Sequence, residues 1–256
     1  MADMLYAKIR VRSDGKERGR TAVLAMGVVR KAWTVAWRSR DDAVPAKNPF
    51  VDMDLYGYQA KRSRPVRRGE LNRFVAAADA AGEPSLGTAA MIVFYFLQLQ
   101  TDILGRLSWT HYRSAEKPNH IQIFHNKTGV LVDVPLYNED GTCLWPEIVA
   151  RLDSAPRKGG LIVTGDLPDR TRKICLPWEI DYFRHRFAAI RLAAGIGPEV
   201  KFMGLRHGGN VEAADAGLTD AQMRALSGHK TVQAPLRYAQ ASDEQSRVGG
   251  SEKTAG

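Results

Sequence analysis

Three residues near the C-terminal end of the chain, Arg206, His229 and Tyr238, have side chains that could act together on a phosphodiester. They lie within FMGLRHGGNVEAADAGLTDAQMRALSGHKTVQAPLRYAQ, residues 202–240, and the tyrosine follows the histidine by nine positions. A phenol is a potential nucleophile, an arginine fork binds two phosphate oxygens, and a histidine donates a hydrogen bond or a proton. Their presence together in a basic chain suggests chemistry on a phosphate backbone.

The charge of the chain favours a polyanionic partner. The sequence has 37 Lys and Arg residues against 28 Asp and Glu residues, for a net charge of +9. Each phosphate that a cation neutralises releases condensed counterions, so this excess favours binding to nucleic acid. A generally basic soluble protein has the same balance, and charge by itself does not separate the two.

Composition argues against several other classes of protein. No apolar run reaches the roughly 18 residues of a membrane helix, and the polar N-terminus does not resemble a secretory signal. Cys143 and Cys175 are far apart and outside a CxxC spacing, which disfavours a disulfide scaffold and a structural zinc site. We therefore expect a cytoplasmic, nucleoid-associated protein with no membrane partner and no bound metal.

Apolar periodicity predicts a mainly α protein with a small antiparallel β-sheet, an α+β fold. Helices are expected at residues 21–38, 68–81, 88–104, 144–152 and 178–194, and in three pieces from residue 205 that break at Gly217, at Gly228 and after Tyr238. Residues 121–124 and 130–136 flank an Asn-Lys-Thr-Gly turn and predict a β-hairpin, and residues 161–163 predict a brief strand. Residues 1–20 are polar and basic, with a turn signal at residues 14–15.

Several motifs, in this order and spacing, resemble the tyrosine recombinase (phage integrase) family. The hairpin HNKTGVLVDVPL, the helix segment LRHGG, the turn SGHK and the segment LRYAQ match the family's catalytic segments. ILGRLSWTHYR, and NPF followed by a basic linker and RRGELNRFV, extend the resemblance over roughly residues 20 to 240. The resemblance implies a recombinase catalytic domain preceded by a partial helical core-binding segment.

The resemblance also implies a role for each matching residue. Tyr238 would attack a DNA phosphodiester and form a 3′-phosphotyrosyl bond, Arg206 would clamp the phosphate, Lys127 would act as general acid, and His229 would contact the phosphate. The covalent bond conserves the phosphodiester energy, so the strands can rejoin without ATP, metal or other cofactor. The implied partner is double-stranded DNA, with a homo-oligomer that is a tetramer in an active member, and no small-molecule substrate.

The 256 residues divide into three predicted regions. Residues 1–63 are expected to form a shortened helical N-terminal segment with a basic linker, residues 64–240 the catalytic domain, and residues 241–256 a polar disordered tail. Basic side chains of the linker and one beyond the Ser-Gly-His turn are candidates for contact with the DNA backbone: Lys61, Arg62, Arg64, Arg67, Arg68 and Lys230.

Two positions depart from the family's pattern. The family has an earlier arginine three residues before an acidic residue, and counting back from Asp102 or from Trp109 reaches Leu99 or Gln100. Arg106 is the nearest arginine, about two helical turns from Leu99. A histidine usually precedes the second arginine by three residues, where this chain has Met203.

These departures leave alternatives to a working recombinase. One is a catalytically degenerate, DNA-binding accessory protein or remnant integrase, and another is a strand transferase of the type IB topoisomerase kind.

Other residues have plain structural interpretations. His207 is expected to be structural, since neighbouring positions on a helix point about 100° apart. Gly208 and Gly209 are expected to permit a close approach of their helix to another segment. His111, His120, His125 and His185 show no ligand spacing and are interpreted as structural or surface residues.

Overall fold

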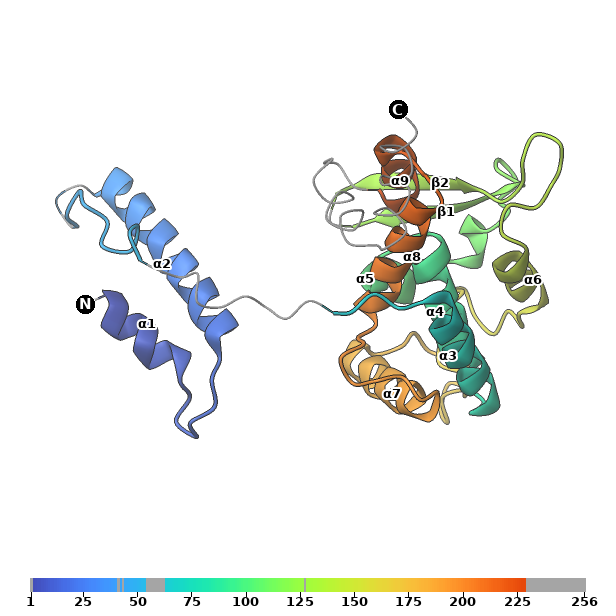
Figure 1. Cartoon of the computed structure of the whole chain (residues 1–256), viewed down its shortest axis with the longest axis horizontal. Coiled ribbons are helices and arrows are strands. Elements are labelled where there is room, and N and C mark those ends of the chain that lie inside the picture. The colour runs from blue at the N-terminus through green and yellow to red at the C-terminus, as the bar shows by residue number, and fades with distance from the viewer. Residues whose placement is uncertain (1, 41, 43, 54–62, 127, 229–256) are drawn as a thin grey trace, which may run out of the picture. The chain divides into compact units, whose positions relative to one another are not determined.

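The structure of this chain is a computed structural model that describes residues 2–40, 42, 44–53, 63–126 and 128–228 (Figure 1). The chain forms two compact units, Met1–Arg62 and Ser63–Gly256. No helix among the described residues is both long and apolar enough to span a bilayer.

The smaller unit is built on a pair of helices, α1 (Ala2–Arg10) and α2 (Gly19–Ser39). The second was predicted from residues 21–38 and is confirmed, whereas the first occupies a stretch for which only the turn was expected. Tyr6 and Ile9 of α1 pack against a small apolar cluster that includes Met26 and Phe50. These tertiary contacts stabilise α1. The composition of α1 is too polar to indicate a buried face, which is why the sequence did not predict this helix.

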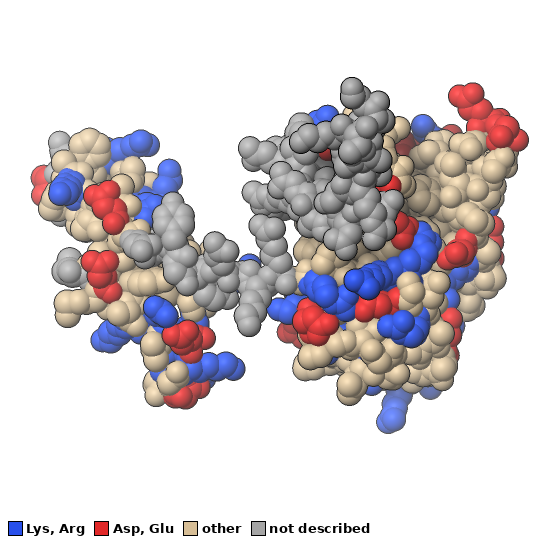
Figure 2. Space-filling model, viewed as in Figure 1, with Lys and Arg blue, Asp and Glu red and all other residues tan. Residues whose placement is uncertain are grey.

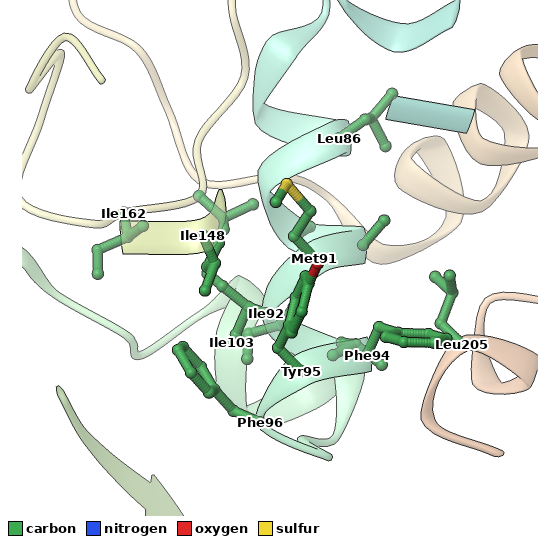
Figure 3. Packing of buried hydrophobic residues seen from close by; sticks show 14 of the residues in the cluster. Leu86, Met91, Ile92, Phe94, Tyr95, Phe96, Ile103, Ile148, Ile162 and Leu205 are labelled. Carbon is green, nitrogen blue, oxygen red and sulfur yellow. The ribbon is translucent and has the colours of Figure 1, made fainter. Parts of the chain in front are cut away.

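The larger unit is organised around α4 (Pro84–Tyr95), whose residues from Ser85 to Tyr95 are all buried. This helix packs against α3 (Arg68–Ala80), α5 (Gln100–Leu104), α6 (Pro146–Ser154) and α8 (Met203–Asp215). Figure 3 shows its side chains at the centre of the apolar core, among residues of α5, α6 and α8. A helix that is apolar on all sides is stable in water only when neighbours cover every face.

The prediction of one long helix over residues 88–104 was wrong. The helix α4 ends at Tyr95, and α5 begins at Gln100 after a four-residue break. Within the break, Leu97 adopts a φ of 56°, a left-handed conformation that side chains other than glycine rarely take. Uniform burial removes the periodicity that would have marked the break, and tertiary packing compensates for the strained backbone.

The hairpin was predicted and is confirmed. Strands β1 (His120–His125) and β2 (Val130–Pro135) pair antiparallel, with His125 opposite Val130 beside the turn. Gly129, at the end of the turn, has a φ of 66°. The strand expected at residues 161–163 is wrong, since Leu161 forms only an isolated bridge with Ser108.

The remaining elements are the short helix η1 (Trp109–His111), α7 (Ile180–Ala193) and α9 (Asp220–Ser227). Thr219 caps α9 by accepting a hydrogen bond from the backbone N–H of Gln222, and Gly228 ends the helix with a φ of 66°. The structure confirms a mainly α fold with a small antiparallel sheet. The third predicted helical piece, around Tyr238, lies outside the described residues.

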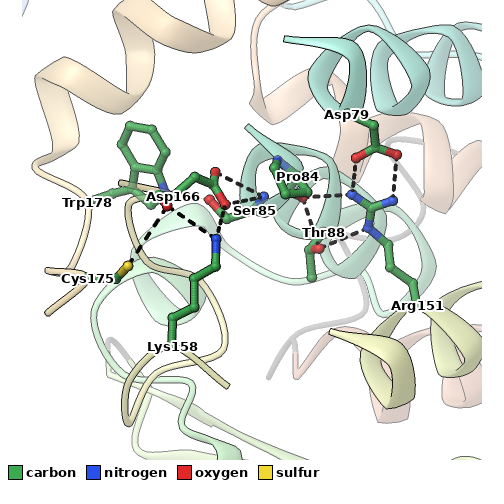
Figure 4. Close-up of polar contacts among 9 residues, drawn as sticks. All are labelled: Asp79, Pro84, Ser85, Thr88, Arg151, Lys158, Asp166, Cys175 and Trp178. Atoms are coloured by element: carbon green, nitrogen blue, oxygen red, sulfur yellow. Dashed lines mark hydrogen bonds and ion pairs between the residues drawn. The ribbon is translucent and has the colours of Figure 1, made fainter. Parts of the chain in front are cut away.

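A polar network joins α6 to α3 and α4 (Figure 4). Arg151 of α6 donates to both carboxylate oxygens of Asp79, at 2.6 and 3.0 Å, and to Thr88 Oγ1 at 2.9 Å. Nearby, Trp178 Nε1 donates to Ser85 Oγ at 2.9 Å. These bonds satisfy polar groups at the margin of the core. They also hold α4 in place against the helices that pack on it.

Candidate active site

Arg206 lies inside the larger unit, on the second turn of α8. Its side chain is buried, with the residue 3% exposed, and Nη2 donates a 3.0 Å hydrogen bond to the backbone carbonyl of Ser227. Asn210, one turn further along α8, is also buried and donates to the Arg206 carbonyl at 2.7 Å. The guanidinium is thus tied to the end of α9, two residues before His229.

Two glycines bring α8, which carries Arg206, close to α4 and to the segment before α3. A Cβ added at Gly208 would overlap the carbonyl oxygen of Val66 and lie 2.8 Å from its carbon. A Cβ at Gly209 would overlap the carbonyl oxygen of Phe94 and lie 2.8 Å from Leu97 Cδ2. The expectation of close backbone packing at these glycines is therefore confirmed, since both face main-chain atoms that cannot rotate away.

The hairpin turn is held by a buried carboxylate. Asp102 of α5 is 2% exposed, and its Oδ1 accepts a 3.3 Å hydrogen bond from the backbone N–H of Asn126, the residue before Lys127. Its Oδ2 has no hydrogen-bond partner among the described residues. Burial lowers the pKa of the nearby His125 ring. The Asp102 carboxylate partly opposes this effect, because its negative charge raises the pKa of the ring.

Three of the four predicted catalytic residues, Lys127, His229 and Tyr238, lie outside the described residues, and their roles stay predictions. The structure brings together the segments that flank two of them. The helix α9, which leads to His229, packs against β2, which follows the Lys127 turn (Figure 1). Arg206 is the one predicted catalytic residue that the structure describes, and it is bonded to the same end of α9.

The structure describes the residues at both positions where the sequence departs from the family pattern. Leu99 is half-buried, and it immediately precedes α5 and stands three residues before Asp102. Met203 is the first residue of α8 and is 37% exposed. Arg106 is exposed and lines a cavity of about 310 Å³ together with Asp102 and His111. An arginine is therefore present beside the buried carboxylate. It follows α5 in the chain, whereas the family's arginine would stand at Leu99, before α5.

The basic linker is partly engaged within the protein. Arg64 binds Glu70 at 2.7 Å and Glu199 at 3.2 Å, and Arg68 binds Glu212. Figure 2 shows basic and acidic side chains next to one another on the viewer's face of the larger unit. These ion pairs hold the segment that contains Arg64 and Arg68 against other parts of the larger unit, so the structure provides a second role for both residues.

Contact of the linker residues with DNA stays a prediction. Arg67 is exposed, which is the arrangement that contact with a DNA backbone requires. Lys61, Arg62 and Lys230 lie outside the described residues. His207 Nδ1 lies 3.2 Å from the backbone carbonyl of Ser63, which agrees with the structural role expected for it.

Sequence reasoning assigned no particular role to two buried polar side chains near this site, Gln98 and His125. They are 0% and 2% exposed and hydrogen-bonded to each other. A signal for His125 was available, because Ile121, Ile123 and His125 alternate along one strand and all three point inward. For Gln98 there was no signal, since its burial depends on the break between α4 and α5.

Comparison with known structures identifies the fold. The chain resembles a lambda integrase (75–356) dimer bound to a COC′ core site, with a TM-score of 0.69 and 19% identity over 93% of this chain and 78% of that one. It also resembles a single-residue variant of the Tn1549 transposon integrase (aa 82–397) in complex with a circular intermediate DNA, with a TM-score of 0.68 and 16% identity over 98% and 84% of the two chains.

The chain has the fold of the tyrosine recombinases. A third similar structure, XerA recombinase, has a TM-score of 0.53 and 15% identity over 98% of this chain and 80% of that one. No protein-family model and no curated protein matches the sequence. The recombinase fold expected from the motifs is confirmed by three-dimensional similarity at identities of 15 to 19%.

Proposed function

We propose that this chain is a site-specific DNA recombinase, or integrase, of a mobile genetic element. In the proposed reaction the Tyr238 oxygen attacks the phosphorus of a DNA phosphodiester, and the bond from phosphorus to the 5′ oxygen breaks. Tyr238 releases its proton to solvent as it attacks, and Lys127, protonated from solvent, gives a proton to the departing 5′ oxygen. The products are a 3′-phosphotyrosyl bond and a free 5′-hydroxyl, and reversal with a new 5′-hydroxyl joins the exchanged strands.

The observation that carries this proposal is the buried Arg206 bonded to the carbonyl of Ser227. An arginine stays protonated in a protein, and its guanidinium presents a fork of N–H donors that matches the oxygens of a phosphate. A scissile phosphate beside α9 would accept hydrogen bonds from this fork, and the low local dielectric would strengthen its attraction to the guanidinium. The hydrogen bond to Ser227 orients the fork before DNA binds, so little reorganisation is required in the transition state.

Double-stranded DNA is the proposed partner, and several copies of the chain are proposed to assemble on it. The net charge of +9 supports binding to a polyanion, and two of the similar structures are integrases in complex with DNA. The lambda integrase structure is a dimer on its core site. Recombination exchanges strands between two DNA sites, which requires more than one nucleophile and supports an oligomer.

Trapping on a nicked suicide substrate that carries the element's own end sequence tests the proposal. Once the short 5′ fragment diffuses away, the phosphotyrosyl bond cannot reverse, and a covalent protein–DNA band accumulates. We expect this band with the native chain and none with Tyr238→Phe, which removes only the nucleophilic oxygen. An Arg206→Gln variant should lower the rate by about 100-fold or more, the typical contribution of one charged donor in a transition state.

A second candidate is a DNA-binding protein that no longer cuts. Leu99 and Met203 favour it, because neither side chain can stabilise or protonate a phosphate oxygen where the family has an arginine and a histidine. Steeply salt-dependent DNA binding without any covalent band would support this candidate and contradict the recombinase. Relaxation of a supercoiled plasmid that lacks paired sites would instead indicate activity of the topoisomerase kind.

A further inference from the structure

Gln98 joins three separate segments of the larger unit through its side chain. It lies in the break between α4 and α5 and is fully buried. Its amide nitrogen donates to the backbone carbonyl of Phe96 and, at 2.8 Å, to that of Leu226 in α9. Its amide oxygen lies 2.5 Å from Nε2 of His125, at the end of β1.

These contacts determine which atoms carry protons. The two N–H groups of Gln98 are both used on carbonyls, and reversing the amide would place its oxygen against two other oxygens. The oxygen must therefore face His125, whose Nε2 must carry a hydrogen and donate it. Burial lowers the pKa of His125, Arg206 lowers it further, and the Asp102 carboxylate opposes both. The ring is then neutral near pH 7, with the hydrogen on Nε2.

The edge of the His125 ring that carries Nδ1 and Cε1 is packed against the turn at the end of α9. A Cβ added at Gly228 would lie 2.5 Å from His125 Nδ1 and 2.9 Å from Val132 Cγ2. Gly228 also needs its φ of 66°, a conformation that glycine adopts without cost. The imidazole thus fills the space between the hairpin and this turn, and a larger residue at position 228 would displace it.

We propose that Gln98 and His125 are positioning residues of the strand-transfer site, which hold the Lys127 turn in register with the turn before His229. This inference rests on the proposed function. His125 is two residues before Lys127, and Gly228 is directly before His229, so a shift of either contact moves a catalytic segment. A misplacement of about 1 Å at a reacting centre can lower a rate by about 100-fold.

A pair of substitutions separates the hydrogen bond from the volume of the ring. His125→Phe keeps an aromatic ring but removes the donor, whereas His125→Gln keeps an N–H that can reach the amide oxygen of Gln98. His120→Phe is the matched control, because it is a half-exposed histidine on the same strand with no described side-chain hydrogen bond. Each variant is assayed for single-turnover formation of the covalent band on the suicide substrate, for DNA affinity and for thermal unfolding.

We expect His125→Phe to lower the single-turnover rate by about 10- to 100-fold with DNA affinity within about threefold of the native chain. His125→Gln should recover most of the rate, and His120→Phe should retain it. Equal rates for the two His125 variants, or a rate for His125→Phe equal to that of the native chain, would overturn the inference while leaving the proposed function intact. Absence of the covalent band from the native chain would remove the proposed function and this inference with it.

A second measurement reports the position of the ring hydrogen directly. In the native chain labelled with ¹⁵N-histidine, NMR should show the His125 ring as the neutral Nε2–H tautomer at pH 7, and the signals of this ring are those that disappear in His125→Gln. A His125 ring that carries its proton on Nδ1, or on both nitrogens, cannot make the described bond to Gln98 and would contradict the inference.

Discussion

Replacing Gly209 by alanine tests the packing that places Arg206. The added Cβ would overlap the Phe94 carbonyl oxygen and lie 3.0 Å from its carbon, whereas carbon atoms in contact are separated by roughly 3.5–4.0 Å. The overlap with the oxygen is the tighter of the two, so the helix α8 must move away from α4 by about 1 Å or more. Overpacking of this kind costs about 1–3 kcal/mol, and the better helix propensity of alanine returns up to about 1 kcal/mol.

We expect Gly209→Ala to lower the free energy of unfolding by about 1–2 kcal/mol, as measured by urea denaturation. The control is Gly69→Ala in α3, where a Cβ meets nothing within 4 Å. That variant should leave the free energy of unfolding unchanged or raise it by up to about 1 kcal/mol. Displacement of α8 should also break the 3.0 Å bond from Arg206 to Ser227 and lower the suicide-substrate rate by about 100-fold. A Gly209→Ala protein as stable as Gly69→Ala would refute the packing argument.

Three further outcomes are expected. Arg106 is exposed beside Asp102 and makes no described ion pair, so its charge is available to a DNA phosphate. Arg106→Gln should therefore weaken DNA binding and reduce the slope of log affinity against log salt concentration by about 1, as measured by salt titration. The hydrogen bond from Arg64 lowers the pKa of Glu70, so Glu70 stabilises the fold above about pH 4.3, its unfolded value, and loses this contribution as pH falls through the folded pKa. Glu70→Gln should therefore lower the melting temperature at pH 7 and have little effect once the pH is well below the folded pKa of Glu70. The double variant Leu99→Arg, Met203→His should raise the suicide-substrate rate by about 100-fold if both positions face the scissile phosphate, and an unchanged rate would show that they do not.

Much of the architecture could be predicted from local patterns in the sequence. The helix α2 and the hairpin follow from periodicities of 3.6 and 2 residues. The pair Gly208 and Gly209 indicated close packing of α8, because two adjacent glycines weaken a helix unless another segment needs the space. The order and spacing of the motifs that resemble the family indicated the recombinase fold, which three-dimensional similarity then confirmed.

Local patterns failed where packing covers every side of a segment. The helix α4 is buried throughout, so residues 88–104 carried no signal of the break that contains Leu97 and Gln98. The helix α1 was missed for the opposite reason, because its few apolar residues become significant only against Met26 and Phe50. In both cases the decisive contacts join residues that are distant in sequence.

The sequence by itself determined the types of the candidate catalytic residues, their order along the chain, and the local elements that carry them. Only the tertiary structure decided that Arg206 is buried against the end of α9 and that Gln98 and His125 join that end to the hairpin. Spacing along a chain specifies which helix or strand face a residue occupies. Which distant carbonyl or ring it meets depends on how the helices pack, and here the side-chain-free surfaces of Gly208, Gly209 and Gly228 allow the approach.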